Sequence, residues 1–191
     1  MKSRLLMAAG ALMLIAVYCM PIWSITLTAP QYPDGLGMFI SVNNIAGRDQ
    51  HDLQNINILN HYVGMRPIVP DEIPELDLMP WLFAGLIVTG LAVAAMGKPS
   101  FIIAWLILFS LCGTAGFVDF YMWGYDYGHN LDPKAAIKIP GESYQPPLLG
   151  TQQMLNIRAA SYPYWGSLFI GISFFMGGIA TWLEYKPNKK G

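Results

Sequence analysis

Charge is scarce in this sequence. Only 12% of its 191 residues are Asp, Glu, Lys or Arg, which is about half the share found in an ordinary soluble domain. The formal net charge is −1, so the chain lacks the basic face of a nucleic-acid-binding protein and the high net charge of a disordered one. Hydrophobic residues make up 54% of the sequence. This composition is typical of an integral membrane protein, and we expect no nucleic-acid partner.

Cysteine and histidine are also rare. Cys19 and Cys112 fall in different apolar blocks at different expected depths, so a disulfide scaffold is not expected. The three histidines, His51, His61 and His129, all lie outside the apolar blocks, which argues against an intramembrane haem. The CxxCH motif of attached c-type haem and the HExxH and paired CxxC motifs of zinc sites do not occur. The sequence therefore offers no familiar haem or zinc motif.

Four apolar blocks are each long enough to cross a bilayer. A hydrocarbon core about 30 Å thick requires roughly 20 residues of helix. Lipid admits only segments that satisfy their own backbone hydrogen bonds, so we predict that the spans are helical. They are expected over about 5–23, 80–97, 101–123 and 163–183. The sequence thus predicts an all-α membrane protein with four transmembrane helices and one integral membrane domain, 1–191.

The first block has a second interpretation as a secretory signal peptide, because Lys2 and Arg4 precede it. A signal peptide carries small residues before its cleavage site, and the stretch 18–21 supplies none. Cleavage of a lipoprotein type before Cys19 is also disfavoured, since Tyr18 is bulky. We therefore favour an uncleaved membrane anchor over a signal peptide.

Basic residues predict the orientation of the chain. Those that fall on one side of a four-span arrangement are Lys2, Arg4, Lys98, Lys186, Lys189 and Lys190. The positive-inside rule places this side in the cytoplasm, together with both chain termini. Two long loops, about 25–79 and 124–162, then face outward. Whatever the protein does, we expect it to happen on the outer side of the membrane.

The first outward loop does not resemble a flexible linker, which would be rich in glycine, serine and charge. Residues 32–35 carry a turn signal, and 38–42 form a β-like run. Apolar residues then recur at helical spacing over 49–63, with Asp49 or Asp52 as the N-cap. We predict an amphipathic helix here that lies on the membrane surface or on the second loop.

The second outward loop is dense in proline, glycine and tyrosine. Such a loop can be rigid without regular structure. We expect it to contain only a short helical turn, around 154–157, at the edge of the membrane. Both loops are therefore predicted to be structured extracytoplasmic segments.

One histidine has a neighbour that suggests a metal site. His61 and Met65 are four residues apart, so they share a face if the helix continues. Imidazole and thioether form a soft ligand set that suits copper, particularly Cu(I). Other methionines of the outward layer that extend this candidate set are Met38, Met79 and Met154. In the alternative interpretation, His61 is a hydrogen-bonded packing residue and Met65 seats the loop on lipid.

Two further polar residues have open roles. His129 lies in an acid-rich cluster above the third block, where it is either a metal ligand or part of a turn held by Asx-type hydrogen bonds. Asp119 is the single acid well inside an apolar block. An intramembrane acid is a functional candidate because its burial is costly. A structural ion pair with Arg158 or Lys134 is an equal alternative for Asp119.

Longer phrases in the two loops resemble a known family. They are YPDGLGMFI, LQNINILNHYVGM, GHNLDPKAAIKIPGESYQPPLLG and LNIRAASYP. These phrases resemble the small multi-pass membrane accessory proteins of clade II (atypical) nitrous oxide reductase gene clusters. The resemblance covers both outward loops and implies a periplasm-facing accessory protein in a bacterial inner membrane. Carried over to this sequence, it leaves His61, Met65 and His129 as candidate functional residues.

The sequence favours an accessory protein that assists the maturation or copper supply of a periplasmic metalloenzyme such as nitrous oxide reductase. It would bind Cu(I) transiently in its outer loops, and copper is the only cofactor we expect. The alternative is a non-catalytic structural subunit of a larger respiratory membrane complex. An enzyme is disfavoured, because no nucleophile–base pair, cofactor motif or paired carboxylate stands out. The expected partners are the lipid bilayer and a protein in or at the membrane.

Overall fold

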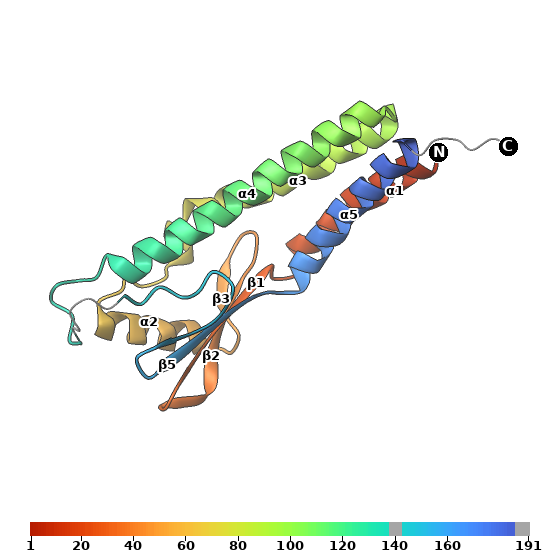
Figure 1. Cartoon of the computed structure of the whole chain (residues 1–191). Helices are drawn as coiled ribbons and strands as arrows, with labels where there is room; N and C mark the ends of the chain where they lie inside the picture. The colour runs from red at the N-terminus through yellow and green to blue at the C-terminus, as the bar shows by residue number, and fades with distance from the viewer. Residues whose placement is uncertain (138–142, 186–191) are drawn as a thin grey trace.

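The computed structural model describes residues 1–137 and 143–185. Figure 1 shows a bundle of long helices with a small β-sheet and a short helix at one end. The elements in chain order are α1 (Lys2–Met13), the 3₁₀ helix η1 (Leu14–Tyr18), β1 (Trp23–Ala29), β2 (Tyr32–Ile40), β3 (Ile45–Gly47), α2 (Asp52–Val63), the 3₁₀ helix η2 (Pro70–Glu72), α3 (Pro74–Met96), α4 (Pro99–His129), β4 (Gly150–Met154), β5 (Ile157–Pro163) and α5 (Trp165–Tyr185).

The prediction of an all-α protein is wrong, because both loops contribute strands to one antiparallel sheet. The strand order is β3-β2-β1-β5-β4. The central pair joins the first loop to the second, with Trp23 opposite Pro163 and Thr28 opposite Arg158. A strand such as β5, with the sequence IRAASYP, carries no strong alternation of its own. Its partner lies far away in the sequence, so no local pattern reveals the pairing.

Three helices in the described part of the chain are long and apolar enough to cross a membrane, namely α3, α4 and α5. They correspond to the predicted spans 80–97, 101–123 and 163–183. Helix α3 begins earlier than expected, at Pro74, so Pro80 lies inside the helix and is not its first residue. These apolar helices are compatible with a protein that associates with the lipid bilayer.

The first apolar block, predicted as one span over 5–23, is divided in the structure. It forms the 12-residue helix α1 and the five-residue 3₁₀ helix η1, and Trp23 already belongs to β1. The β1 strand starts there because Trp23 is paired with Pro163, at the end of β5. Helix α1 runs beside α5, and the start of α1 and the end of α5 lie at the end of the bundle away from the sheet (Figure 1).

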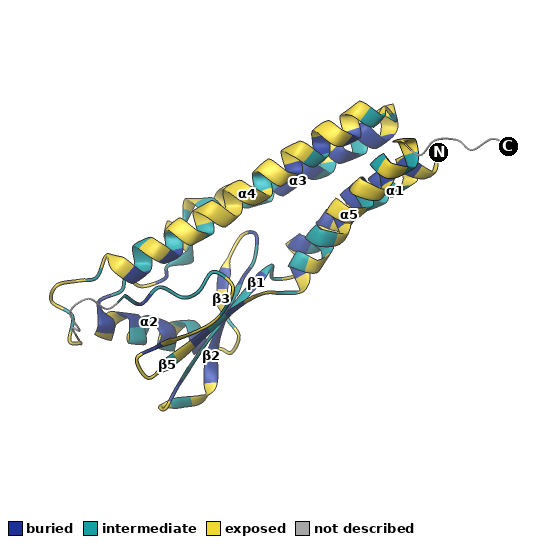
Figure 2. Cartoon of the chain, in the orientation of Figure 1, coloured by how far each residue is buried: buried dark blue, intermediate teal, exposed yellow. Residues whose placement is uncertain are grey.

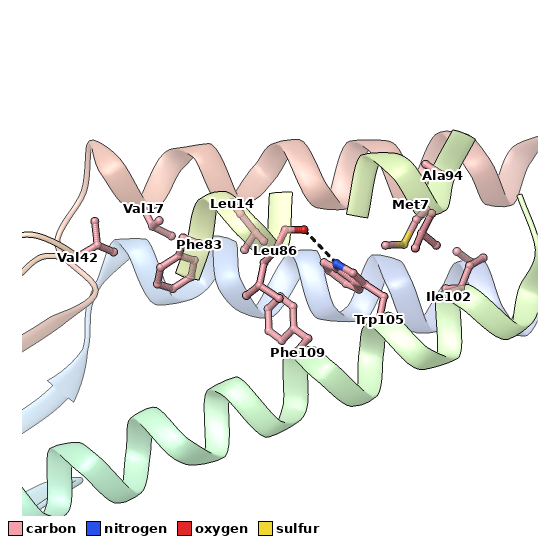
Figure 3. Packing of buried hydrophobic residues seen from close by; sticks show 12 residues of the cluster. Met7, Leu14, Val17, Val42, Phe83, Leu86, Ala94, Ile102, Trp105 and Phe109 are labelled. Atoms are coloured by element: carbon pink, nitrogen blue, oxygen red, sulfur yellow. Dashed lines mark hydrogen bonds between the residues drawn. The ribbon is translucent and has the colours of Figure 1, made fainter. Parts of the chain in front are cut away.

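The bundle has a continuous apolar core, shown in Figure 3. Met7 from α1, Phe83 from α3 and Trp105 from α4 are buried there. The indole Nε1 of Trp105 donates a hydrogen bond to the carbonyl of Leu86, at 3.0 Å, which ties α4 to α3. The outer faces of α3 and α4 are largely exposed (Figure 2). This arrangement is expected of helices whose outer faces contact lipid.

The sheet is attached directly to α1 and α5. The amide of Tyr164 donates to the carbonyl of Ile22 at 3.0 Å, and the amide of Gly166 donates to that of Pro21 at 2.8 Å. A Cβ at Gly166 would lie 2.8 Å from the same Pro21 oxygen. The close approach of these two chain segments lets the α1–α5 helix pair continue as the β1–β5 strand pair.

The predicted amphipathic helix over 49–63 is confirmed as α2. It begins at Asp52, and Gly64 ends it in the left-handed conformation with φ +86°. His51 occupies the N-cap position, so the prediction of Asp49 or Asp52 as the cap is wrong. The buried Asp52 carboxylate instead accepts hydrogen bonds from the amides of Gly37 and Asp49. These contacts hold α2 against the sheet. Val63, at the end of α2, also packs against Tyr144 and Met154 of the second loop, which was one of the two predicted locations for this helix.

Two predicted turns are also wrong. Residues 32–35 belong to β2, and the β1–β2 hairpin closes earlier, with Ala29 opposite Tyr32. Gly35, with φ +77°, lies in an irregularity of the β1–β2 pairing, which explains the turn-like composition. The segment 154–157 is no helical turn, because it closes the β4–β5 hairpin with Met154 opposite Ile157. Leu155 takes a positive φ of 53° in this hairpin.

Candidate functional site

We call the five-stranded sheet together with α2 the sheet layer. Helix α4 reaches into this layer because it is longer than a membrane requires. Its 31 residues extend about 46 Å, against a hydrocarbon core of about 30 Å. Phe117 and Phe120 pack edge-on against Trp23, with ring centroids 5.9 Å and 5.5 Å apart. The last turns of α4 therefore cover the sheet.

A cavity of about 50 Å³ lies between the sheet, α2 and the end of α4. Its lining is mainly aliphatic and aromatic, but it also contains three methionines. Met38 comes from β2, Met65 follows α2, and Met154 ends β4. Met38 is 3% exposed and Met154 is 8% exposed, whereas Met65 is half-buried. The fold thus brings three thioethers from three separate segments to one cavity.

Local structure explains how each methionine reaches the cavity. Met38 stands in the β2 ladder between Ile25 of β1 and Gly47 of β3. Met65 is positioned by the left-handed Gly64, after which its amide donates to the carbonyl of Asn60 at 2.8 Å. A side chain at Gly64 would meet Ala135 and Asp132. The turn that directs Met65 is therefore fixed by the second loop.

The two candidate histidines do not line this cavity. His61 is exposed on α2, and the helix ends at Val63, so Met65 does not continue the helical face of His61. His129, at the end of α4, is exposed and stacks on Tyr125 with ring centroids 3.9 Å apart. Its Nδ1 lies 3.0 Å from the Tyr125 carbonyl oxygen. Met38 and Met65 thus line one cavity, and both histidines lie elsewhere.

Of the other two candidate methionines, one lines the cavity and one does not. Met154, one of the additional candidates, lines the cavity. Met79 lies in α3 and packs where the bundle core meets the core of the sheet layer. Met79 does not line the cavity, which makes it a natural control position.

Asp119 is exposed on α4. It lies close enough to Glu75, in the first turn of α3, for the two carboxylates to interact electrostatically. In the part of the chain that the structure describes, Asp119 forms no ion pair with either Arg158 or Lys134. Asp119 is therefore at the level where α3 begins, beside another acid, rather than deep in the bundle.

A short chain segment closes the cavity on the side of α4. The amide of Tyr144 donates to the carbonyl of Gly128 at 3.0 Å. A Cβ at Gly128 would lie 2.5 Å from the Cα of Gln145, so only glycine allows this approach. Gly124, one turn earlier on the same helix, also lines the cavity. The two glycines, four residues apart, are visible in the sequence. Nothing in the sequence indicates which segment packs against them.

One buried polar group of the cavity lining, the hydroxyl of Tyr144, has no hydrogen-bond partner among the described residues. Tyr144 is only 5% exposed. Buried polar groups are nearly always hydrogen-bonded, so this hydroxyl needs an explanation. No feature of the sequence singled it out.

The described residues contain no group of three or more His, Cys, Asp or Glu side chains placed to hold a metal ion. Comparison with known proteins supplies no family, because no family model and no curated protein matches the chain. The resemblance of the loop phrases to nitrous oxide reductase accessory proteins stays a prediction.

Proposed function

We propose that this chain is a non-catalytic accessory protein of the bacterial inner membrane. In this proposal it assists the maturation or copper supply of a periplasmic metalloenzyme such as nitrous oxide reductase. It handles Cu(I) transiently in the sheet layer, which faces the periplasm. The protein partner is this enzyme or a component of its assembly route.

The observation that carries the proposal is the difference between the two ends of the molecule. The sheet, α2 and the end of α4 lie at one end (Figure 1), and every candidate soft ligand except Met79 lies in or next to these elements. The described part of the other end holds the start of α1, the end of α5 and the tight α3–α4 turn at Gly97 and Lys98. A protein built in this way has its working surface on one side of the membrane.

We further propose that α1 and η1 together form a fourth membrane crossing. Leu14 and Val17 are buried in the same core as Phe83 of α3 and Trp105 of α4. Helix α1 also runs along α5, and the hydroxyl of Tyr18 donates to the carbonyl of Pro80 at 2.5 Å. Such a well-packed segment favours an uncleaved anchor over a signal peptide.

The positive-inside rule supports the proposed orientation. Lys2, Arg4 and Lys98 lie at the end of the bundle away from the sheet. The Arg4 side chain lies directly against the α3–α4 turn at Gly97. The other basic residues that predict the orientation, Lys186, Lys189 and Lys190, lie outside the described residues. With this end in the cytoplasm, the sheet layer faces the periplasm.

A structural subunit of a larger respiratory complex is the second candidate. It is favoured by the glycines on the outer face of α4, since a Cβ at Gly113 or Gly116 would meet nothing within 4 Å. Small residues on a transmembrane helix permit close approach by another helix. Large apolar side chains around them, such as Leu111 and Phe117, are more than half exposed.

A deletion strain of a nitrous-oxide-respiring bacterium separates the two functions. If the chain supplies copper, the periplasmic reductase accumulates with a low copper content, and excess copper in the medium restores part of its activity. If the chain is a structural subunit, the reductase contains its normal copper, and the chain purifies with a large complex in mild detergent. A fully loaded, active reductase in the deletion strain would overturn the copper-supply proposal.

A further inference from the structure

We propose that the cavity between the sheet, α2 and α4 is a thioether site for one Cu(I) ion, with Met38, Met65 and Met154 as its ligands. This inference rests on the proposed function for its biological role only. The site itself is argued from the residues that line the cavity. It places copper away from both candidate histidines, His61 and His129.

The chemistry of the lining selects a soft monovalent cation. Thioethers are soft, neutral ligands that suit Cu(I), whereas Mg²⁺, Ca²⁺ and Mn²⁺ prefer carboxylate, carbonyl and water oxygens. No Asp, Glu, His or Cys lines the cavity. A single positive charge is also easier to place among apolar side chains than a double one. The lining is therefore matched to Cu(I) and to its chemical analogue Ag(I).

The size of the cavity points in the same direction. Pockets for drug-sized organic ligands span roughly 300–1,000 Å³, and this cavity has about 50 Å³. A water molecule would fit, but it needs two to four polar partners, and the lining is largely apolar. One ion with at most one small co-ligand is the occupant that suits both the volume and the chemistry.

The unpartnered hydroxyl of Tyr144 supplies a place for such a co-ligand. Tyr144 lines the cavity, and its hydroxyl has no partner among the described residues. A tyrosine hydroxyl donates a hydrogen bond to an acceptor. A halide or water bound to Cu(I) as an additional ligand would accept this hydrogen bond. The same cavity thus contains soft ligands for the cation and a donor for an anionic or neutral co-ligand.

The competing explanation is that the three methionines only fill space. Methionine is flexible and commonly fills irregular gaps in apolar cores. Leucine has a similar volume, and Leu/Met exchange is among the best tolerated core substitutions. Replacement of methionine by leucine therefore removes the ligand atom while it preserves most of the packing. This difference makes the two explanations separable.

The first test is competition for Cu(I) between the full-length protein in detergent and a chromogenic Cu(I) chelator, under anaerobic conditions. The wild-type protein should bind one equivalent. The M38L/M65L/M154L variant should bind at least tenfold more weakly, and M79L, H61A and H129A should bind like wild type. Circular dichroism and thermal unfolding check that each variant is folded. Failure of the wild type to bind copper, or unchanged binding by the triple variant, would overturn the site.

A second measurement needs no variant and so remains decisive if the triple variant misfolds. The X-ray absorption spectrum of copper in the loaded wild-type protein reports the ligand atoms directly. A ligand shell dominated by sulfur is expected. A shell dominated by nitrogen would instead assign the copper to histidine and reject the thioether site.

The triple variant also separates the failure of the site from the failure of the function. It is expressed in the deletion strain, and the copper content of the reductase is measured. If the variant binds no Cu(I) in vitro but the reductase is loaded normally, the site stands and its role in copper supply fails. If the variant binds Cu(I) normally while loss of the chain lowers reductase copper, the function stands and the site fails.

Discussion

Each helix of the bundle satisfies its backbone hydrogen bonds within one segment, whereas each strand of the sheet layer requires another segment of the chain. The bundle helices α3, α4 and α5 coincide with apolar blocks that are visible in the sequence. The central strands β1 and β5 belong to different loops and are adjacent only after the chain has folded. Local composition therefore specifies the first region, and long-range pairing specifies the second.

The two regions also differ in what their close contacts achieve. In the bundle, glycine lets helices approach one another around Gly90 of α3. In the sheet layer, Gly128 of α4 lets a loop segment approach a helix and close the cavity. The first contact stabilises the membrane anchor, and the second shapes the candidate site. Substitutions at these positions test whether the regions respond independently.

The largest effect is expected for Gly90→Leu. A Cβ at Gly90 would lie 2.8 Å from the Cβ of Ala11 and 3.2 Å from the ring of Trp105. The larger side chain should force α1 and α4 away from α3 and cost about 3 kcal/mol of folding free energy. Thermal unfolding in detergent measures this loss. Gly85→Leu is the matched control, because a Cβ there meets nothing within 4 Å. Equal stability of the two variants would contradict the packing described for the bundle.

A smaller and more local effect is expected for Gly128→Ala. The added methyl collides with the backbone of Gln145, so the segment that begins at Tyr144 should leave α4. We expect a loss of about 2 kcal/mol. Amide hydrogen exchange should increase in 143–149 while the bundle core keeps its protection. Gly124→Ala is the control, since a Cβ there has no neighbour nearer than 3.9 Å. Faster exchange throughout α3 and α5 would show that the two regions do not respond independently.

The smallest effect, a gain of stability, is expected for Leu155→Gly. Leu155 has φ +53° in the β4–β5 hairpin, a left-handed conformation that costs most L-residues about 1–2 kcal/mol. Glycine removes this strain at some cost in chain entropy, so a net gain of about 1 kcal/mol is expected. Chemical denaturation monitored by the sheet signal measures it. Leu149→Gly, at an exposed position without positive φ, should give no gain.

The candidate site could be predicted only in part. The sequence predicted Met38, Met65 and Met154 as candidate soft ligands, because they lie in the loops between apolar blocks. Their convergence was not predictable, since it depends on the β1–β5 pairing and on the left-handed turn at Gly64. The spacing of His61 and Met65 suggested a shared helical face, but the helix ends between them. Sequence spacing is a guide to geometry only while one element continues.

The sequence by itself determined which segments form the long apolar helices and where the amphipathic helix α2 lies. It could do so because a helix closes its hydrogen bonds locally, and its apolar pattern records its surroundings residue by residue. Only the tertiary structure decided the sheet order, the end of α2 relative to Met65 and the enclosure of the cavity by Tyr144. These features depend on contacts between segments far apart in the chain, and such contacts leave no periodic pattern in either segment.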